Sequence, residues 1–229
     1  MDANRGGKQK IPRPQNWTMG GPPPWSEIRI PSINLDSIKK TFTDKDLQPV
    51  KESTYDRKSS VLIPLYEAEG EVWVILTRRS ETMRFHTSEV SFPGGNQEPQ
   101  DVDPWDTALR EAHEEIGLHP SLPLKLGHLD SFVTVGSKSF VTPFVAALNH
   151  RPQLKANPAE VEKILHVSLT ELFSKDVFRE EVWVLRDGKK RSINFFELIG
   201  DTVWGATGTM IRQFLTTILH INESSEIEE

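Results

Sequence analysis

Hydrophobic and polar residues alternate in blocks along the chain, and these blocks predict both strands and helices. Two runs rich in Val, Ile and Leu, at 60–66 and 71–77, flank Glu67 to Gly70, which predicts a β-hairpin. Four later segments also have the composition of strands, namely 126–135, 140–148, 178–185 and 192–198. Asp187-Gly188, between the last two segments, is a typical hairpin turn.

Two further segments have the periodicity of amphipathic helices. The first runs from Pro104 to Ile116, with Asp103 suited to the N-cap and Gly117 to the C-terminal stop. The second lies near the C-terminus, and its apolar stripe consists of Met210, Ile211, Phe214, Leu215, Ile218 and Leu219. Strands, a helix, more strands and a closing helix predict an α/β fold in which helices flank a mixed β-sheet.

The two ends of the chain differ from its middle. Residues 1–25 are rich in Gly, Pro and basic residues, which is typical of a flexible or draped tail. Trp17 and Trp25 could equally pin this segment onto the folded body or onto a second subunit, so a homodimer stays open. Residues 222–229 are acidic and predict a solvated tail, which leaves one domain at 26–221.

Composition narrows the class of protein. The 229 residues are 36% hydrophobic and 26% charged, which is typical of a single globular domain. We expect a cytoplasmic protein with no membrane partner, because no apolar run approaches the roughly 18 residues of a membrane span and residues 1–10 lack a signal peptide's apolar stretch. Without cysteine, the chain has no disulfide, zinc–thiolate site or thiol nucleophile.

The net charge limits the choice of ligand. At −6, it disfavours a broad nucleic-acid-binding surface, so we expect no nucleic-acid partner. A local basic pocket for a phosphorylated small molecule remains compatible with this charge. An acidic enzyme acting on such a substrate needs arginine, lysine or metal at its site.

The first predicted helix brings three carboxylates together. Its apolar face is predicted to pack on the sheet and consists of Trp105, Leu109, Ala112 and Ile116. Glu111, Glu114 and Glu115 lie within an arc on the opposite side, where they repel one another unless a cation neutralises them. Mg²⁺ or Mn²⁺ suits such oxygen ligands, and can bridge substrate phosphates and activate water. Arg110, at the edge of this face, is expected to orient a carboxylate.

The surrounding sequence decides between a cation site and an ordinary solvated helix surface. Gly94-Gly95 precedes an acidic loop, and the block Arg110-Glu111-Ala112-His113-Glu114-Glu115-Ile116-Gly117-Leu118 follows it. This arrangement resembles the signature of the Nudix hydrolases. The resemblance implies an α/β/α sandwich and a metal-dependent pyrophosphohydrolase. It also implies that Glu111, Glu114 and Glu115 hold Mg²⁺ or Mn²⁺ and act in catalysis with Arg110.

The acidic loop departs from the family pattern. Counted from Gly95, the early acidic position falls on Asp101, and eight residues rather than the family's seven separate Asp101 from Arg110. Asp101, Glu98 and Asp103 therefore compete for the outer acidic role. Their interpretation as turn and cap residues is favoured.

A second motif resembles the coenzyme A diphosphatase branch of the family. It comprises Ile75 to Ser80, Arg84, and Phe92 to Gly95, with Ser88 where that branch has a glycine. Trp204-Gly205-Ala206-Thr207 is also similar to this branch. The resemblance implies hydrolysis of coenzyme A or acyl-coenzyme A to phosphopantetheine and adenosine 3′,5′-bisphosphate. The residues it assigns to substrate binding are Arg78, Arg79, Arg84, Gly94 and Gly95.

Alternatives stay open at this point. Each arginine could instead pair with a surface acid such as Glu81 or Glu89. Nudix enzymes take their general base from the helix or from a later loop. Glu160 follows the turn at Asn157-Pro158, and it is either this general base or an ordinary surface acid. The substrate could also be ADP-ribose or NADH. The chain could instead be a binding protein, namely a non-catalytic Nudix domain that senses a nucleotide. The complete set of three glutamates argues against this alternative.

Overall fold

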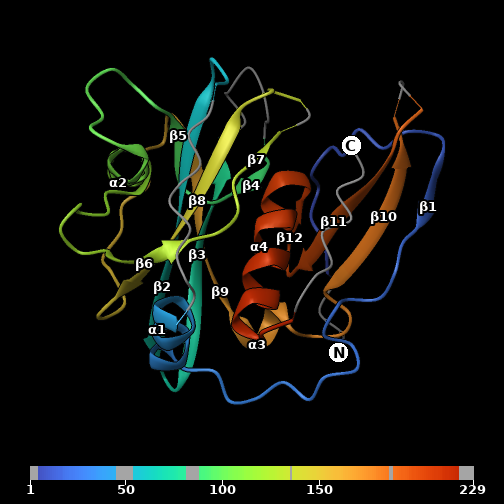
Figure 1. The fold of residues 1–229 in the computed structure, drawn as a ribbon, viewed down its shortest axis with the longest axis horizontal. Helices are drawn as coiled ribbons and strands as arrows, with labels where there is room; N and C mark the ends of the chain where they lie inside the picture. The colour runs from blue at the N-terminus through green and yellow to red at the C-terminus, as the bar shows by residue number, and fades with distance from the viewer. Residues whose placement is uncertain (1–4, 45–53, 81–87, 135, 186–187, 222–229) are drawn as a thin grey trace.

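The computed structural model describes residues 5–44, 54–80, 88–134, 136–185 and 188–221, which form two β-sheets and the helices packed on them (Figure 1). In the larger sheet, β2 (Lys58–Ala68) and β3 (Glu71–Arg79) form the expected antiparallel hairpin, and β2 also pairs in parallel with β8 (Phe140–Leu148). The sheet is completed by β4 (Val90–Ser91), β5 (Gly94–Asn96), β6 (Leu124–His128), β7 (Phe132–Val133) and β9 (Val161–Ser168). The prediction of a mixed sheet is confirmed.

The smaller sheet is antiparallel. Its strands lie in the order β1 (Trp17–Met19), β10 (Phe178–Val184), β11 (Lys190–Leu198) and β12 (Asp201–Trp204). Helix α4 (Gly205–Ile218) lies between the two sheets, and α2 (Pro104–Ile116) covers the opposite face of the larger sheet (Figure 1). The remaining helices are α1 (Leu35–Asp44), which packs near α4, and the short α3 (Leu169–Leu172).

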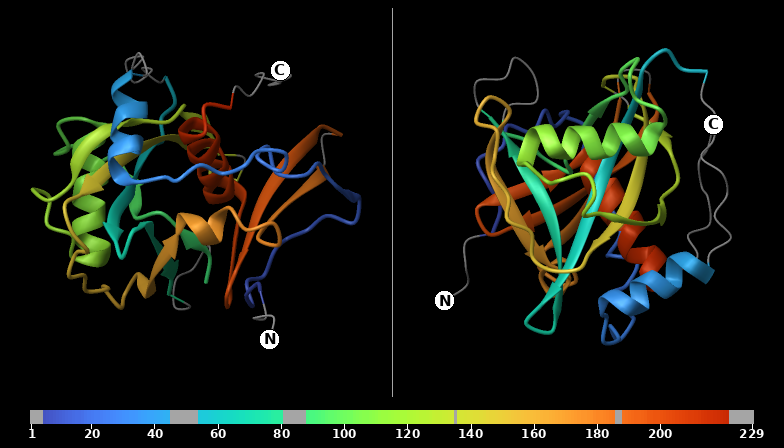
Figure 2. Two further views of the ribbon diagram at one scale, coloured as in Figure 1. Left: turned by 90° about the horizontal axis from the view of Figure 1, so that it is seen from below. Right: turned by 90° about the vertical axis from the view of Figure 1, so that its left-hand side faces the viewer.

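Side-chain alternation along the central strands divides the core in two. Successive residues of a strand point to opposite faces. Leu62 and Tyr66 of β2 therefore pack with Ala108 and Ala112 of α2. On the other face, β2 and β3 pack against α4 and the smaller sheet, through residues that include Ile63, Leu65, Val74, Leu76, Ile211 and Phe214. The helix with the three glutamates is thus fixed to one face of the sheet (Figure 2).

Several predicted elements need correction. The single strand expected at 126–135 is wrong: β6 and β7 are separate. Leu129 N still donates to Pro143 O of β8 at 2.9 Å, but Pro143 has no N–H to return the hydrogen bond. Strands β10 and β11 pair as expected, although Asp187 of their predicted turn lies outside the described residues. The sequence did not predict α1, α3, β1, β4, β5 or β12.

The described part of the N-terminal segment lies on the folded body. Trp17 of β1 pairs with Trp183 of β10. Trp25 is only 3% exposed, and its ring contacts Phe178 and Phe196. The division at 1–25, 26–221 and 222–229 stays a prediction, and the last of these segments lies outside the described residues. Within the described ranges, no helix is long and apolar enough to cross a membrane.

Candidate functional site

Helix α2 begins and ends where its sequence predicts. Asp103 is the N-cap, and its side chain accepts a hydrogen bond from Asp106 N at 2.8 Å. Pro104 is the first helical residue, and Gly117 ends the helix with a left-handed φ of 68°. These two ends fix the position of the glutamates along the helix axis.

The packing face of α2 agrees with the prediction in part. Ala108, Ala112 and Ile116 are fully buried, and Trp105 packs against the same core. Leu109 is half-buried and does not belong to this core. The small side chains of Ala108 and Ala112 let the helix lie close to the sheet and turn Glu115 inward. As a result, Glu115 is only 2% exposed, although the helical pattern placed it on the solvent side.

The three glutamates form a graded series from buried to exposed. The side chains of Glu115, Glu111 and Glu114 are 3%, 14% and 50% exposed, respectively. Arg110 Nη1 lies 3.0 Å from Glu111 Oε1 and 3.1 Å from Glu114 Oε2. Arg79 Nη1 lies 3.9 Å from Glu115 Oε1. One arginine therefore faces the outer carboxylates, and another faces the inner one.

Glu115 and Glu111 lie in an environment that disfavours negative charge. Burial raises the pKa of Glu115 to about 8, although the charge of Arg79 opposes this shift. Burial also raises the pKa of Glu111. The negative charge of Glu160 contributes to both shifts, which shows that Glu160 lies near these two groups. A bound cation would reverse this balance and favour the ionised carboxylates.

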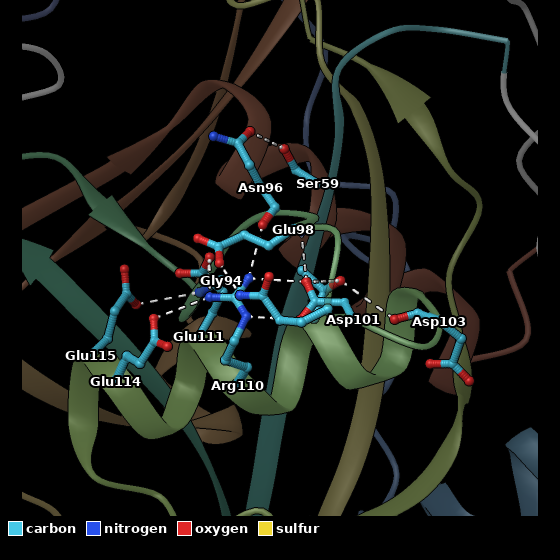
Figure 3. Close-up of polar contacts among 12 residues, drawn as sticks. Ser59, Gly94, Asn96, Glu98, Asp101, Asp103, Arg110, Glu111, Glu114 and Glu115 are labelled. Atoms are coloured by element: carbon cyan, nitrogen blue, oxygen red, sulfur yellow. Dashed lines mark hydrogen bonds and ion pairs between the residues drawn. The ribbon is translucent and has the colours of Figure 1, made fainter.

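The donor set suits a hard divalent ion. Carboxylate oxygens are the ligands that Mg²⁺ and Mn²⁺ favour, and Glu111, Glu114 and Glu115 supply them from neighbouring turns of one helix. In the described ranges, no three acidic or histidine side chains already surround a common point. Arg110 instead occupies the space between Glu111 and Glu114 (Figure 3). Metal binding would therefore require this arginine or the glutamates to change rotamer.

Strand β5 contacts two of the glutamates through Gly94 and Gly95. Gly94 N donates to Glu115 Oε2 at 3.3 Å. A Cβ at Gly95 would lie 2.5 Å from the carboxylate carbon of Glu111, closer than any real side-chain contact. Only glycine therefore lets the β5 backbone reach the carboxylate of Glu111.

Arg110 is fixed by the acidic loop. Its Nε donates to Asp101 Oδ1 at 2.9 Å and its Nη2 to Asp101 Oδ2 at 3.1 Å (Figure 3). These hydrogen bonds hold the pKa of Asp101 at about 2. Asp101 is also a turn residue, since it accepts from Glu98 N at 2.8 Å. Of the three competing acids, Asp101 holds Arg110, Asp103 caps the helix and Glu98 is exposed.

The structure separates the two arginines of the upstream motif. Arg79 faces α2, near Glu115. Arg78 lies on the other face of the sheet, 3.0 Å from both Glu162 Oε1 and Asp201 Oδ1. Sequence reasoning missed Asp201, because it lies in a strand that was not predicted. Arg84 and Glu81 lie outside the described residues.

Ser88, at the position where the motif has a glycine, has an unusual backbone conformation. Its φ is 60°, in the left-handed region that side chains other than glycine rarely adopt. Glycine would adopt this conformation without strain.

Comparisons with known proteins agree with this geometry. The family described as NUDIX domain matches residues 56–187. The chain is 39% identical over 194 residues to the chloroplastic Nudix hydrolase 22 of Arabidopsis thaliana, a match that covers 80% of this chain but only 63% of that protein. It is 32% identical over 163 residues to the peroxisomal coenzyme A diphosphatase of Mus musculus, covering 71% and 68% of the two chains.

A solved structure supports the fold alone. The crystal structure of a MutT/nudix family protein from Enterococcus faecalis superposes with a TM-score of 0.51 at 14% identity, over 82% of this chain and 75% of that one. The predicted α/β architecture, with helices on a mixed sheet, is confirmed.

Proposed function

The chain belongs to the Nudix hydrolase family, and from that premise we propose that it is a divalent-metal-dependent pyrophosphohydrolase acting on coenzyme A or an acyl-coenzyme A. Water attacks one phosphorus of the diphosphate, and the bond from that phosphorus to the bridging oxygen breaks. The products are phosphopantetheine and adenosine 3′,5′-bisphosphate. The observation that carries the proposal is the pair of carboxylates on the signature helix, the buried Glu115 and the half-buried Glu111.

Each site residue has a distinct part in this reaction. Glu111, Glu114 and Glu115 would hold Mg²⁺ or Mn²⁺, which when bound neutralises phosphate charge and makes water more acidic. Gly94 N–H fixes Glu115, and Gly95 leaves room for Glu111.

The remaining residues act on the substrate and on the water. Arg110, itself held by Asp101, orients Glu111 and Glu114. Arg79 lies on the same face as the glutamates and stabilises negative charge on the substrate phosphates. Glu160 accepts the proton of the attacking water.

The choice of coenzyme A rests on two observations. The mouse relative is by name a coenzyme A diphosphatase. The upstream motif is present, and Ser88, at the motif's glycine position, has a φ of 60°, which glycine adopts readily. We assign substrate binding to Arg79, Gly94 and Gly95, and to Arg84 on the motif alone.

A substrate panel tests the proposal. The purified protein is incubated with Mg²⁺ or Mn²⁺ and with coenzyme A, acetyl-coenzyme A, ADP-ribose, NADH or a dinucleoside polyphosphate, and products are separated by chromatography. We expect kcat/KM for a coenzyme A species to exceed that of the other substrates by about tenfold or more, a difference of about 1.4 kcal/mol in transition-state binding. Faster turnover of ADP-ribose or NADH would support the alternative pyrophosphatase. Binding without any turnover would support a nucleotide sensor.

The cellular location is a separate part of the proposal. We propose that the protein acts in the cytoplasm. Relatives include proteins named as chloroplastic and peroxisomal. Imaging of the tagged full-length protein decides the matter, and fluorescence confined to an organelle would refute a cytoplasmic location.

A further inference from the structure

Arg78 lies at a junction of the two sheets, on the face of β3 away from α2. Its Nε and Nη2 donate to the two carboxylate oxygens of Glu162 at 3.2 and 3.0 Å. Its Nη1 donates to Asp201 Oδ1 at 3.0 Å. The guanidinium group thus binds two carboxylates at once, one from the larger sheet and one from the smaller.

Glu162 is the extra residue of a β-bulge. In the pairing of β3 with β9, Arg78 lies opposite Lys163 and Arg79 opposite Val161, so Glu162 has no partner residue in the ladder. A bulge changes the direction of a strand and of its side chains, and bulges are frequent beside active sites. Here the bulge turns Glu162 toward Arg78. Glu160 lies two residues earlier, directly before the first residue of β9.

The segment before the bulge lies against the catalytic helix. Ser80 N donates to Glu160 O at 2.8 Å, so the end of β3 holds the backbone of Glu160. Asn157 N donates to Glu115 O at 2.8 Å, which connects the same loop to α2. The backbone on which the Glu160 side chain stands is thus connected to β3 on one side and to α2 on the other.

Asp201 is the buried anchor of this junction. It is 1% exposed and lies at the start of β12. Gln9 of the N-terminal segment donates to the same Oδ1 atom at 2.9 Å and accepts from Thr202 N at 3.0 Å. The N-terminal segment and the smaller sheet thus both support the carboxylate that binds Arg78.

We propose that Arg78 and Asp201 are positioning residues that fix the bulge at Glu162 and thereby hold Glu160 in place for catalysis. This inference rests on the proposed role of Glu160 as the general base. It gives Arg78 a different role from the substrate contact that the sequence motif implies. A guanidinium that binds two carboxylates on the far face of the sheet is poorly placed to bind a phosphate beside α2.

Four variants test the proposal with whichever substrate the wild type hydrolyses. Glu162→Ala removes one partner of Arg78 at a side chain that is 41% exposed, so the protein should fold. Asp201→Asn removes the buried charge, and Glu160→Gln removes the base. Asp176→Ala is the matched control, because it removes an exposed ion pair to Arg5 at 2.5 Å that does not involve Arg78.

The expected result is a loss of kcat that depends on Glu160. Glu162→Ala and Asp201→Asn should each lower kcat by about 10- to 100-fold with KM little changed, because a base displaced by about 1 Å is costly. Glu160→Gln should lower kcat by about 100-fold or more. Adding Glu162→Ala to Glu160→Gln should then cost less than about twofold further, whereas independent roles would multiply. Asp176→Ala should match the wild type.

Other outcomes refute specific parts. If the losses in kcat from Glu160→Gln and Glu162→Ala multiply in the double variant, the positioning role of Arg78 is wrong. A raised KM with unchanged kcat in Glu162→Ala would also overturn it. Neither result would affect the proposed metal site on α2. Wild-type kcat in Glu160→Gln would overturn the base and the positioning role together. If Asp201→Asn does not fold, Glu162→Ala still carries the test.

A crystal structure of Glu162→Ala supplies a readout besides activity. We expect the bulge to be lost or the Glu160 carboxylate to move by about 1 Å or more, the scale at which catalysis suffers. An unmoved Glu160 overturns the inference. If the wild type hydrolyses nothing in the panel, the proposed function fails, and this structure still decides the positioning claim.

Discussion

Replacing Gly95 with alanine should lower the rate of hydrolysis about 100-fold while leaving the fold intact. The new Cβ would lie 2.5 Å from the carboxylate carbon and from both carboxylate oxygens of Glu111. Ordinary contacts begin near 3.4 Å, so the carboxylate must move by about 1 Å. Glu111 is the flexible partner in this clash, and it can rotate away without disturbing the backbone.

The loss follows from the displacement of a proposed metal ligand. A shift of about 1 Å at a reacting centre costs about 100-fold in rate, or about 2.7 kcal/mol of transition-state stabilisation. The assay is steady-state hydrolysis by Gly95→Ala and by wild type over a range of Mn²⁺ concentrations, with thermal unfolding as the check on folding. We expect kcat to fall about 100-fold and the unfolding temperature to change little.

Gly94→Ala is the matched comparison. Here the new Cβ would meet the backbone of Val61, 2.6 Å from its Cα, and the φ of 156° disfavours any side chain. This variant should lose stability, because no flexible side chain can move aside. Wild-type kcat in Gly95→Ala, or equal destabilisation of both variants, would refute the contact between Gly95 of β5 and Glu111.

Three further predictions follow from burial and charge. Because burial raises the pKa of Glu115 from 4.5 to about 8, the metal-free wild type should lose stability as pH rises between those values. Glu115→Gln should therefore unfold at a higher temperature than wild type at pH 8 but not at pH 5, and equal unfolding temperatures at pH 8 would contradict the raised pKa. Arg110 lowers the pKa of Asp101 from 3.8 to about 2, so Asp101→Asn should lower the free energy of unfolding in urea by about 2 kcal/mol at pH 7. This difference between variant and wild type should shrink as pH falls from 3.8 toward 2. A pH-independent difference would show that the ion pair is not its source. Trp25→Ala should lower the free energy of unfolding in urea by about 3–5 kcal/mol, since the ring is buried among phenylalanines. A loss below about 1 kcal/mol would show that Trp25 does not anchor the N-terminal segment to the folded body.

The elements that the sequence predicts well are those with a strong local signal. Helix α2 has an N-cap, an N-terminal proline and a C-terminal glycine, and its bounds agree with the prediction. The hairpin of β2 and β3 has alternating apolar residues around a short turn. By contrast, β1 and β12 are only three and four residues long and form through pairing with distant strands. No local pattern reports such pairing.

The candidate site divides in the same way. The clustering of Glu111, Glu114 and Glu115 could be predicted from their spacing along a helix. Which of them is most buried could not be predicted from that spacing. Glu115 is buried because Ala108 and Ala112 bring the helix close to the sheet, which is a property of the tertiary packing. Arg78 and Arg79 are adjacent in sequence, yet strand alternation sends them to opposite faces, and only the fold brings Asp201 to Arg78.

The central claim is that the glutamates of α2 hold the cation that drives diphosphate hydrolysis. The most direct measurement compares turnover of coenzyme A by wild type and by Glu115→Gln, with Mg²⁺ or Mn²⁺ and with the metal removed by chelator. The account predicts phosphopantetheine and adenosine 3′,5′-bisphosphate from wild type only with metal, and a rate at least about 100-fold lower in the variant. Hydrolysis by Glu115→Gln at the wild-type rate, or undiminished hydrolysis in chelator, would contradict it.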